Sequence, residues 1–129
     1  MSHPLSLSQL PLREMQSQLG EKYSYTADLS QCLNMQKLQV YFEILPPGRK
    51  ASKSHYHSHK EEMLVILEGQ GLLNVGQDCY LLNPGDAFGF QPGREALHVL
   101  ENQGEVDLRY LIITHFSPED TIVWGETAP

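Results

Sequence analysis

The feature that most constrains the fold is the close, even spacing of turn signals after residue 36. Groups of Gly, Pro, Asn and Asp lie at residues 46–48, 68–71, 76–78, 83–86, 91–93 and 102–104. The runs between them are short and rich in Val, Ile, Leu, Phe and Tyr, and none reads as a helix. Short strands at this spacing predict an all-β domain, an antiparallel sandwich or a single antiparallel barrel.

A chain of 129 residues is long enough for one domain with a sizeable core. Residues 36–129 are predicted to form the β domain, and residues 1–35 an N-terminal arm of the same domain. Within the arm we expect one short helix over residues 12–19, ended by Gly20. The segment Ser117–Asp120 is expected to start a helical turn, with Pro118 at its first position.

Charge and cysteine content exclude several classes of protein. The net charge is −7, and the one basic cluster, at Arg49, Lys50 and Lys53, is too small to follow a phosphate backbone, so we expect no nucleic-acid partner. Cys32 and Cys79 are too few and too far apart for a disulfide scaffold or a thiolate zinc site. No signal peptide and no run of about 20 apolar residues is recognised, which predicts a cytoplasmic protein without a membrane partner.

Three of the six histidines fall within the segment SHYHSHKEE at residues 54–62. Alternate residues of a strand share one face, so His55 and His57 are expected on the same side of one strand, about 6.6 Å apart along the backbone. Side chains at that separation can converge on one ion. His59 is assigned to the following turn, because too few residues separate it from Glu62 for both to bind one ion. There it would be exposed or would contact a ligand without binding the ion itself.

Two further residues stand out because they are polar in apolar surroundings. Glu62 opens the run MLVILEG, which we expect to be buried on both faces, and a buried carboxylate is costly unless it is paired or bound to a metal. His98 lies inside the run ALHVL, where a lone histidine is most often a core residue. One divalent transition metal explains these anomalies together with His55 and His57. Three imidazoles and one carboxylate suit Zn, Fe, Mn, Ni or Cu, and an octahedral ion would keep two positions open.

The order of Gly48, His55, His57, Glu62 and Gly69 resembles the first motif of the cupin superfamily, with one extra residue between the first glycine and the first histidine. The segment 92–102, with its proline, glycine, histidine and asparagine, resembles the second motif with a displaced glycine. The resemblance covers roughly residues 40–115. It implies a small single-domain cupin, a β-barrel of the jelly-roll type, and a metal held by the ligands His55, His57, Glu62 and His98.

Three other side chains have two interpretations each. Phe88 and Phe90 share one face of a strand and could line a pocket beside the metal or simply pack in the core. Arg109 would bind an anionic substrate if it faced the interior. The exterior is favoured for Arg109, and Tyr110 then points to the opposite face.

Two functions fit these observations. The first is a metal-dependent enzyme acting on a small oxygenated substrate, a sugar, hydroxy acid or diol, by isomerase, oxygenase or lyase chemistry. The second is a non-catalytic metal-containing module that binds or senses a small molecule. A Tyr, Glu or Lys with a shifted pKa in the interior favours catalysis, and a purely apolar interior favours binding. A homodimer is also expected, because edge strands of small β domains need cover.

Overall fold

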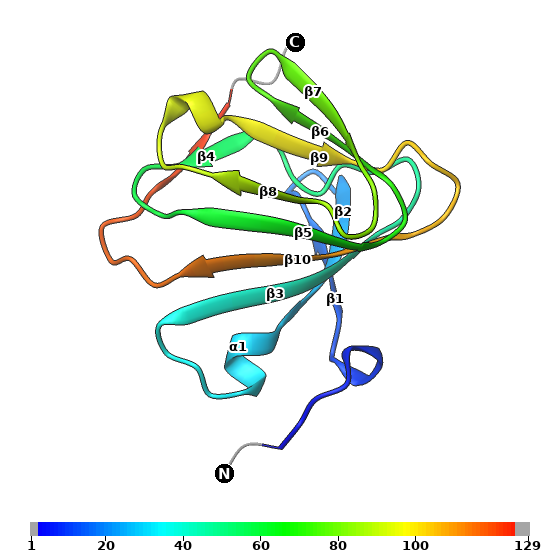
Figure 1. Ribbon diagram of the computed structural model, residues 1–129, viewed down its shortest axis with the longest axis vertical. Coiled ribbons are helices and arrows are strands. Elements are labelled where there is room, and N and C mark those ends of the chain that lie inside the picture. Colours follow the sequence, from blue (N-terminus) through cyan, green and yellow to red (C-terminus); the bar gives the residue numbers. More distant parts are fainter. Residues whose placement is uncertain (1–2, 126–129) are drawn as a thin grey trace.

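Two antiparallel β-sheets make up the computed structural model, which describes residues 3–125 (Figure 1). The six-stranded sheet contains, in spatial order, β1 (Arg13–Gln16), β2 (Lys22–Asp28), β3 (Leu38–Leu45), β10 (Leu108–His115), β5 (Glu62–Glu68) and β8 (Ala87–Phe90). The five-stranded sheet contains β11 (Ile122–Trp124), β4 (His55–His57), β9 (His98–Glu101), β6 (Gly71–Val75) and β7 (Asp78–Leu82). The predicted all-β class is confirmed.

The described helices are short and peripheral. They are two 3-10 turns, η1 (Leu7–Gln9) and η2 (Arg94–Ala96), and one α-helical turn, α1 (Leu29–Cys32). None of the helices between residues 3 and 125 is long and apolar enough to cross a membrane.

The main hydrophobic core lies between the two sheets, because residues of both sheets contribute to one buried cluster. Its members are Leu45, Leu64, Ile66, Phe90, Leu108 and Tyr110 from the six-stranded sheet and Leu73, Leu82 and Leu100 from the five-stranded sheet. Strand alternation explains this set, since residues two apart on each strand share the inner face.

A second, smaller cluster covers the outer face of the six-stranded sheet. Ala27 of β2 and Phe42 of β3 are buried there against Leu10, which follows η1. Leu29 of α1 packs on the same cluster, and Figure 1 places α1 on the side of β3 away from the second sheet. The segments around η1 and α1 therefore shield an apolar sheet face from water.

Two local predictions were wrong, and the one for residues 117–120 was right only in part. Residues 12–19 contain strand β1 in place of a helix, because Arg13 and Glu14 pair with Thr26 and Tyr25 of β2. Residues 117–120 form a single turn that does not continue as a helix, closed by the Asp120 amide donating to the Ser117 carbonyl at 3.1 Å.

The third correction concerns β5, which was expected to be buried on both faces. Leu64 and Ile66 on its inner face are buried, but Met63 on its outer face is 46% exposed. The outer cluster that covers this sheet reaches Leu67 and leaves the Met63 end of the strand open.

Candidate metal centre

The two sheets bring the predicted ligands together from three strands. His55 and His57 lie on the same side of β4, as the alternation predicted, and His98 of β9 is the direct cross-strand partner of His55. Glu62 is the first residue of β5, in the opposite sheet. The site is therefore built across the interior, at one end of the space between the sheets.

Each of the three histidines is held through its Nδ1 atom. Nδ1 of His55 lies 2.9 Å from the Lys53 carbonyl oxygen, and Nδ1 of His98 lies 2.6 Å from that of Ala96. Nδ1 of His57 lies 2.8 Å from Oδ2 of Asp120. A carbonyl or carboxylate oxygen only accepts, so each Nδ1 carries the proton and donates. In each ring Nε2 is then the atom left to bind an ion, which is how metal-binding imidazoles are usually oriented.

The ligand atoms converge on Glu62. One nitrogen each from His55 and His98 and one oxygen of Glu62 lie within 4.8 Å of one another, an arrangement that could hold a metal ion. Nε2 of His98 is 3.6 Å from Oε1 of Glu62, and Nε2 of His57 is 3.2 Å from Oε2. His57 is thus the immediate neighbour of the His55–Glu62–His98 group. The exposed His59 lies in the turn, with Nδ1 against the Ser58 hydroxyl, as expected.

Charges in the site are strongly coupled. Burial raises the pKa of Glu62, but hydrogen bonding to His57 and the nearby His98 outweigh it, and the pKa falls to about 2. The hydrogen bond to Glu62 is the main reason that the pKa of His57 is raised. Burial lowers the pKa of His55, which favours the neutral form that binds metals. The site therefore combines a carboxylate of lowered pKa with one imidazole of raised pKa, His57, and one of lowered pKa, His55.

Asp120 is the member of this site that the sequence analysis missed. Besides His57, its carboxylate accepts hydrogen bonds from the backbone amides of His59 at 2.9 Å and Lys60 at 3.0 Å, both to Oδ1. Burial raises the pKa of Asp120, but the bonds from His57 and the two amides lower it to about 2. Asp120 thereby fixes both the His57 ring and the turn between β4 and β5.

Aromatic rings enclose the histidines on two sides. Phe90 stacks on His98 with ring centroids 3.8 Å apart and planes 16° apart, and it is also a core residue, so both interpretations of this side chain hold. The Trp124 ring on β11 lies 5.3 Å from that of His55. Phe88 packs against the core and contacts Tyr80.

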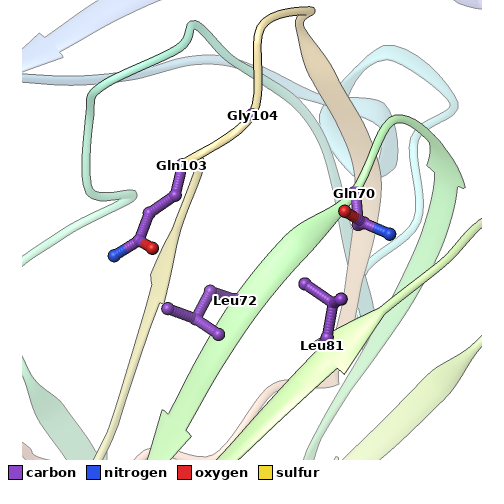
Figure 2. Close-up of a pocket in the computed structure, with 5 residues that line it drawn as sticks. All are labelled: Gln70, Leu72, Leu81, Gln103 and Gly104. Atoms are coloured by element: carbon purple, nitrogen blue, oxygen red, sulfur yellow. The ribbon is translucent and has the colours of Figure 1, made fainter.

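An open cleft of about 1140 Å³ runs from the histidines between the sheets. Its walls include His55, His57, Glu62 and His98 at one end. A second hollow, of about 220 Å³, is lined by the uncharged residues Gln70, Leu72, Leu81, Gln103 and Gly104 (Figure 2). This second hollow offers no metal ligand, so the larger cleft is the candidate functional site.

The cleft also contains a polar group that the sequence analysis did not identify. Oε1 of Glu43 accepts hydrogen bonds from the Tyr110 hydroxyl at 2.6 Å and the Ser24 hydroxyl at 3.1 Å. Thr26 and Tyr110 are the cross-strand neighbours of Glu43 on either side. Burial raises the pKa of Glu43 in spite of these bonds, and burial also raises the pKa of Tyr110 well above its ordinary value.

Arg109 lies outside the cleft, as favoured from the sequence. It pairs with Glu68 at 3.3 Å and approaches Asp107 at 3.9 Å, and its side chain is 37% exposed.

Comparison with known proteins gives one family and several similar structures. Residues 41–114 match the family model described as the Cupin domain. The uncharacterized protein MJ1618 of Methanocaldococcus jannaschii is 35% identical over 80 residues, which are 60% of this chain and 62% of that protein. The match thus spans less than two thirds of that relative.

Two solved structures illustrate the fold similarity. A sugar phosphate isomerase from a cupin superfamily of Silicibacter pomeroyi has a TM-score of 0.87 at 22% identity, over 97% of this chain and 83% of that chain. The polyketide cyclase RemF of Streptomyces resistomycificus has a TM-score of 0.77 at 16% identity, over 98% of this chain and 88% of that chain. At these identities the likeness concerns the fold, and the two named activities differ.

Proposed function

Since this chain belongs to the cupin family, we propose that it binds one divalent transition metal and acts as a metal-dependent enzyme on a small oxygenated substrate. The proposed ligands are His55, His57, Glu62 and His98. The observation that carries the proposal is the shared orientation of the three imidazoles, each with Nδ1 bound to an oxygen and Nε2 left for an ion.

The donor set fits a transition metal better than calcium or magnesium, since imidazole nitrogens outnumber carboxylate oxygens. His57 would have to exchange its contact with Glu62 for a bond to the ion, and the 3.2 Å between the two side chains makes that a small displacement. When bound, such an ion would polarise a substrate oxygen and stabilise negative charge that develops on it.

The chain's own residues supply the rest of the site. Asp120 would hold the His57 ring in place through Nδ1, and Phe90 and Trp124 would exclude water from the imidazoles. The substrate would lie in the cleft, so a sugar, a hydroxy acid or a diol is the proposed class, with isomerase, oxygenase or lyase chemistry.

The alternative is a non-catalytic module that binds or senses a small molecule. It would be favoured by a purely apolar interior, whereas Glu43 and Tyr110 add a carboxyl and a phenol with shifted pKa values to the cleft. Groups of this kind support catalysis over passive binding.

The first test is the metal content of the protein purified from cells grown without added metal. About one divalent ion per chain is expected, followed by turnover in a screen of sugar phosphates, hydroxy acids and catechol-like diols. Zinc affinity should fall as the pH drops through about 6.5, because ligands must lose their protons to bind. The raised pKa of His57 should move the start of this loss to higher pH. A protein that neither carries nor takes up an ion contradicts the proposal.

We further propose that the two sheets form a jelly-roll barrel and that residues 1–35 are an arm of the same domain. Strands β1 and β2, which extend the six-stranded sheet next to β3, support the second point. Backbone hydrogen exchange should then show β1 and β2 protected together with β3, and an arm that exchanges independently would contradict it.

The edge strand β1 supports a homodimer as well. Leu12 and Leu19 flank this strand and Met15 lies on it, with 37%, 99% and 41% of their surfaces exposed. A second copy pairing along this edge would cover them. Light scattering at micromolar concentration should give twice the mass of one chain, and a monomer would contradict the proposal.

A further inference from the structure

The inner part of the cleft carries a polar cluster that takes no part in holding the metal. The cluster consists of Glu43, Tyr110, Ser24 and Thr26, and all four residues line the cleft. Glu43 and Thr26 are only partly buried, whereas Tyr110 and Ser24 are fully buried, so Glu43 and Thr26 are the members of the cluster that a ligand can touch. Three hydroxyl groups around one carboxyl make an unusual neighbourhood for an otherwise hydrophobic interior.

The cluster lies further along the sheet than the metal ligands, yet, besides burial, the charge of Glu62 still contributes to the raised pKa of Glu43. Tyr110 pairs with Ile66 of β5, four residues beyond Glu62 on the same strand. At a rise of about 3.3 Å per residue, the backbone positions are about 13 Å apart. A ligand bound at the histidines could therefore reach the cluster only with its far end.

The charges of the two ends differ. The cationic side chains that line the cleft are Lys53 and Lys60, and both belong to the segment that carries the histidines. The Glu43 cluster has no cation among its hydrogen-bond partners. Burial raises the pKa of Glu43, which favours a neutral carboxylic acid there. An anionic group would thus be accepted at the metal end, and an uncharged hydrogen-bonding group at the cluster.

We propose that Glu43 and Thr26 form a subsite for the uncharged, hydroxyl-bearing end of the ligand, with the buried hydroxyls of Tyr110 and Ser24 holding the Glu43 carboxyl in place. The ligand class is then an acid or metal-binding diol that carries a chain of hydroxyl groups, as in a sugar acid. This inference rests on the proposed function, because the metal would hold the other end. Carboxyl and hydroxyl groups both donate and accept, so they can pair with ligand hydroxyls in either direction.

The decisive experiment compares two acids with the same metal-binding head and chain length. Gluconate carries hydroxyls along its chain, whereas 2-hydroxyhexanoate has a plain alkyl chain, and glycolate is the head alone. Calorimetric titration of the zinc-loaded protein should show gluconate binding at least about 10-fold more tightly than 2-hydroxyhexanoate, since a polar subsite rejects a partner that leaves it unpaired.

Variants assign this preference to the cluster. Glu43→Leu should abolish the preference for gluconate while leaving glycolate affinity within about 2-fold. Glu43→Gln, which keeps a neutral donor and acceptor, should retain most of the preference. Tyr110→Phe, which removes only a hydroxyl, should reduce it. Equal binding of the two acids by the unaltered protein, or an unchanged preference in Glu43→Leu, overturns the proposal.

One arm separates failure of the subsite from failure of the metal site. The neutral polyol glucitol has no carboxylate, and its binding to the metal-free protein is measured by NMR shift changes. Glucitol should perturb residues of β3 and β10 around Glu43 and Tyr110 and do so less in Glu43→Leu. If zinc does not bind, the proposed function fails, and the glucitol result alone still supports or overturns the subsite.

Discussion

Glu62 and Glu43 occupy the same cleft, yet their surroundings shift their pKa values in opposite directions. The pKa of Glu62 is lowered to about 2, whereas the pKa of Glu43 is raised. Burial raises the pKa of both carboxyls, so their different partners account for the opposite shifts. Glu62 faces two imidazoles that can carry positive charge, and Glu43 faces neutral hydroxyls. One fold thus lowers the pKa of the carboxyl at one end of the cleft and raises the pKa of the carboxyl at the other.

The sharpest test of this difference is to replace each carboxyl by an amide. Glu62→Gln removes the anionic member of the proposed ligand set and should weaken zinc binding at least about 100-fold. That is more than the roughly 10- to 100-fold typical of losing a residue that only hydrogen-bonds to a ligand. Glu43→Gln should change zinc affinity less than about 2-fold. Competition with a chromophoric chelator measures both. Similar losses in the two variants would show that the two carboxyls do not have separate roles.

Substitutions of two histidines test which residues bind the proposed metal at the Glu62 end of the cleft. His98→Ala should lower metal occupancy markedly, because Nε2 of His98 faces Glu62, whereas His59→Ala should leave it nearly unchanged. Trp124 is the single tryptophan and lies 5.3 Å from the His55 ring, so quenching of its fluorescence by Co²⁺ or Ni²⁺ reports occupancy. If His59 proved necessary and His55 did not, the strand register of the ligands would be wrong.

The role of Asp120 is a smaller effect at the same end. Asp120→Asn keeps the size of the side chain but removes the charge that faces Nδ1 of His57. We expect zinc affinity to fall about 10-fold, the lower end of the range for residues behind a ligand. The nearby Glu119→Gln, an exposed change in the same turn, is the matched control. An unchanged affinity in Asp120→Asn would remove Asp120 from the site.

The last expected effect is on stability and concerns Glu43. Because its pKa is raised above 4.5 by folding, its stabilising contribution is complete below that pH and declines as the pH rises through the raised pKa. Glu43→Gln cannot ionise and escapes this decline. The metal-free variant should therefore gain stability over the unaltered protein between pH 5 and pH 8. The gain is about 1.4 kcal/mol for each unit of the pKa difference within that interval.

Urea unfolding at the two pH values measures this gain. Glu105→Gln, in the exposed loop after β9, is the control substitution. A stability difference between Glu43→Gln and the unaltered protein that falls with rising pH would contradict the raised pKa.

The sequence predicted the all-β class because turn residues and strand alternation are local signals. The same alternation put His55 and His57 on one face. It could not identify β1, since four residues such as Arg13–Gln16 carry little strand signal and are held by pairing with β2. The prediction that both faces of β5 are buried was also wrong, because the residues that could pack on Met63 would have to come from distant segments of the chain.

The positions of the candidate site residues could be predicted only in part, for similar reasons. Strand alternation could have identified Glu43, because it lies two residues before Leu45 on the same face of an apolar strand. Glu62 has the same relation to Leu64. Asp120 gave no such signal. It lies in a turn, where an acidic residue is ordinary, and its contact with His57 spans 63 positions of sequence.

That separation has a consequence for how the protein is made. His57 is synthesised 63 residues before Asp120, which corresponds to about 3 to 13 s at common translation rates of about 5–20 residues per second. During this interval the nascent chain carries a cluster of histidines without the carboxylate that orients one of them. The fully oriented site is therefore a late product of translation, and loading of the proposed metal should follow release of the 117–124 segment from the ribosome.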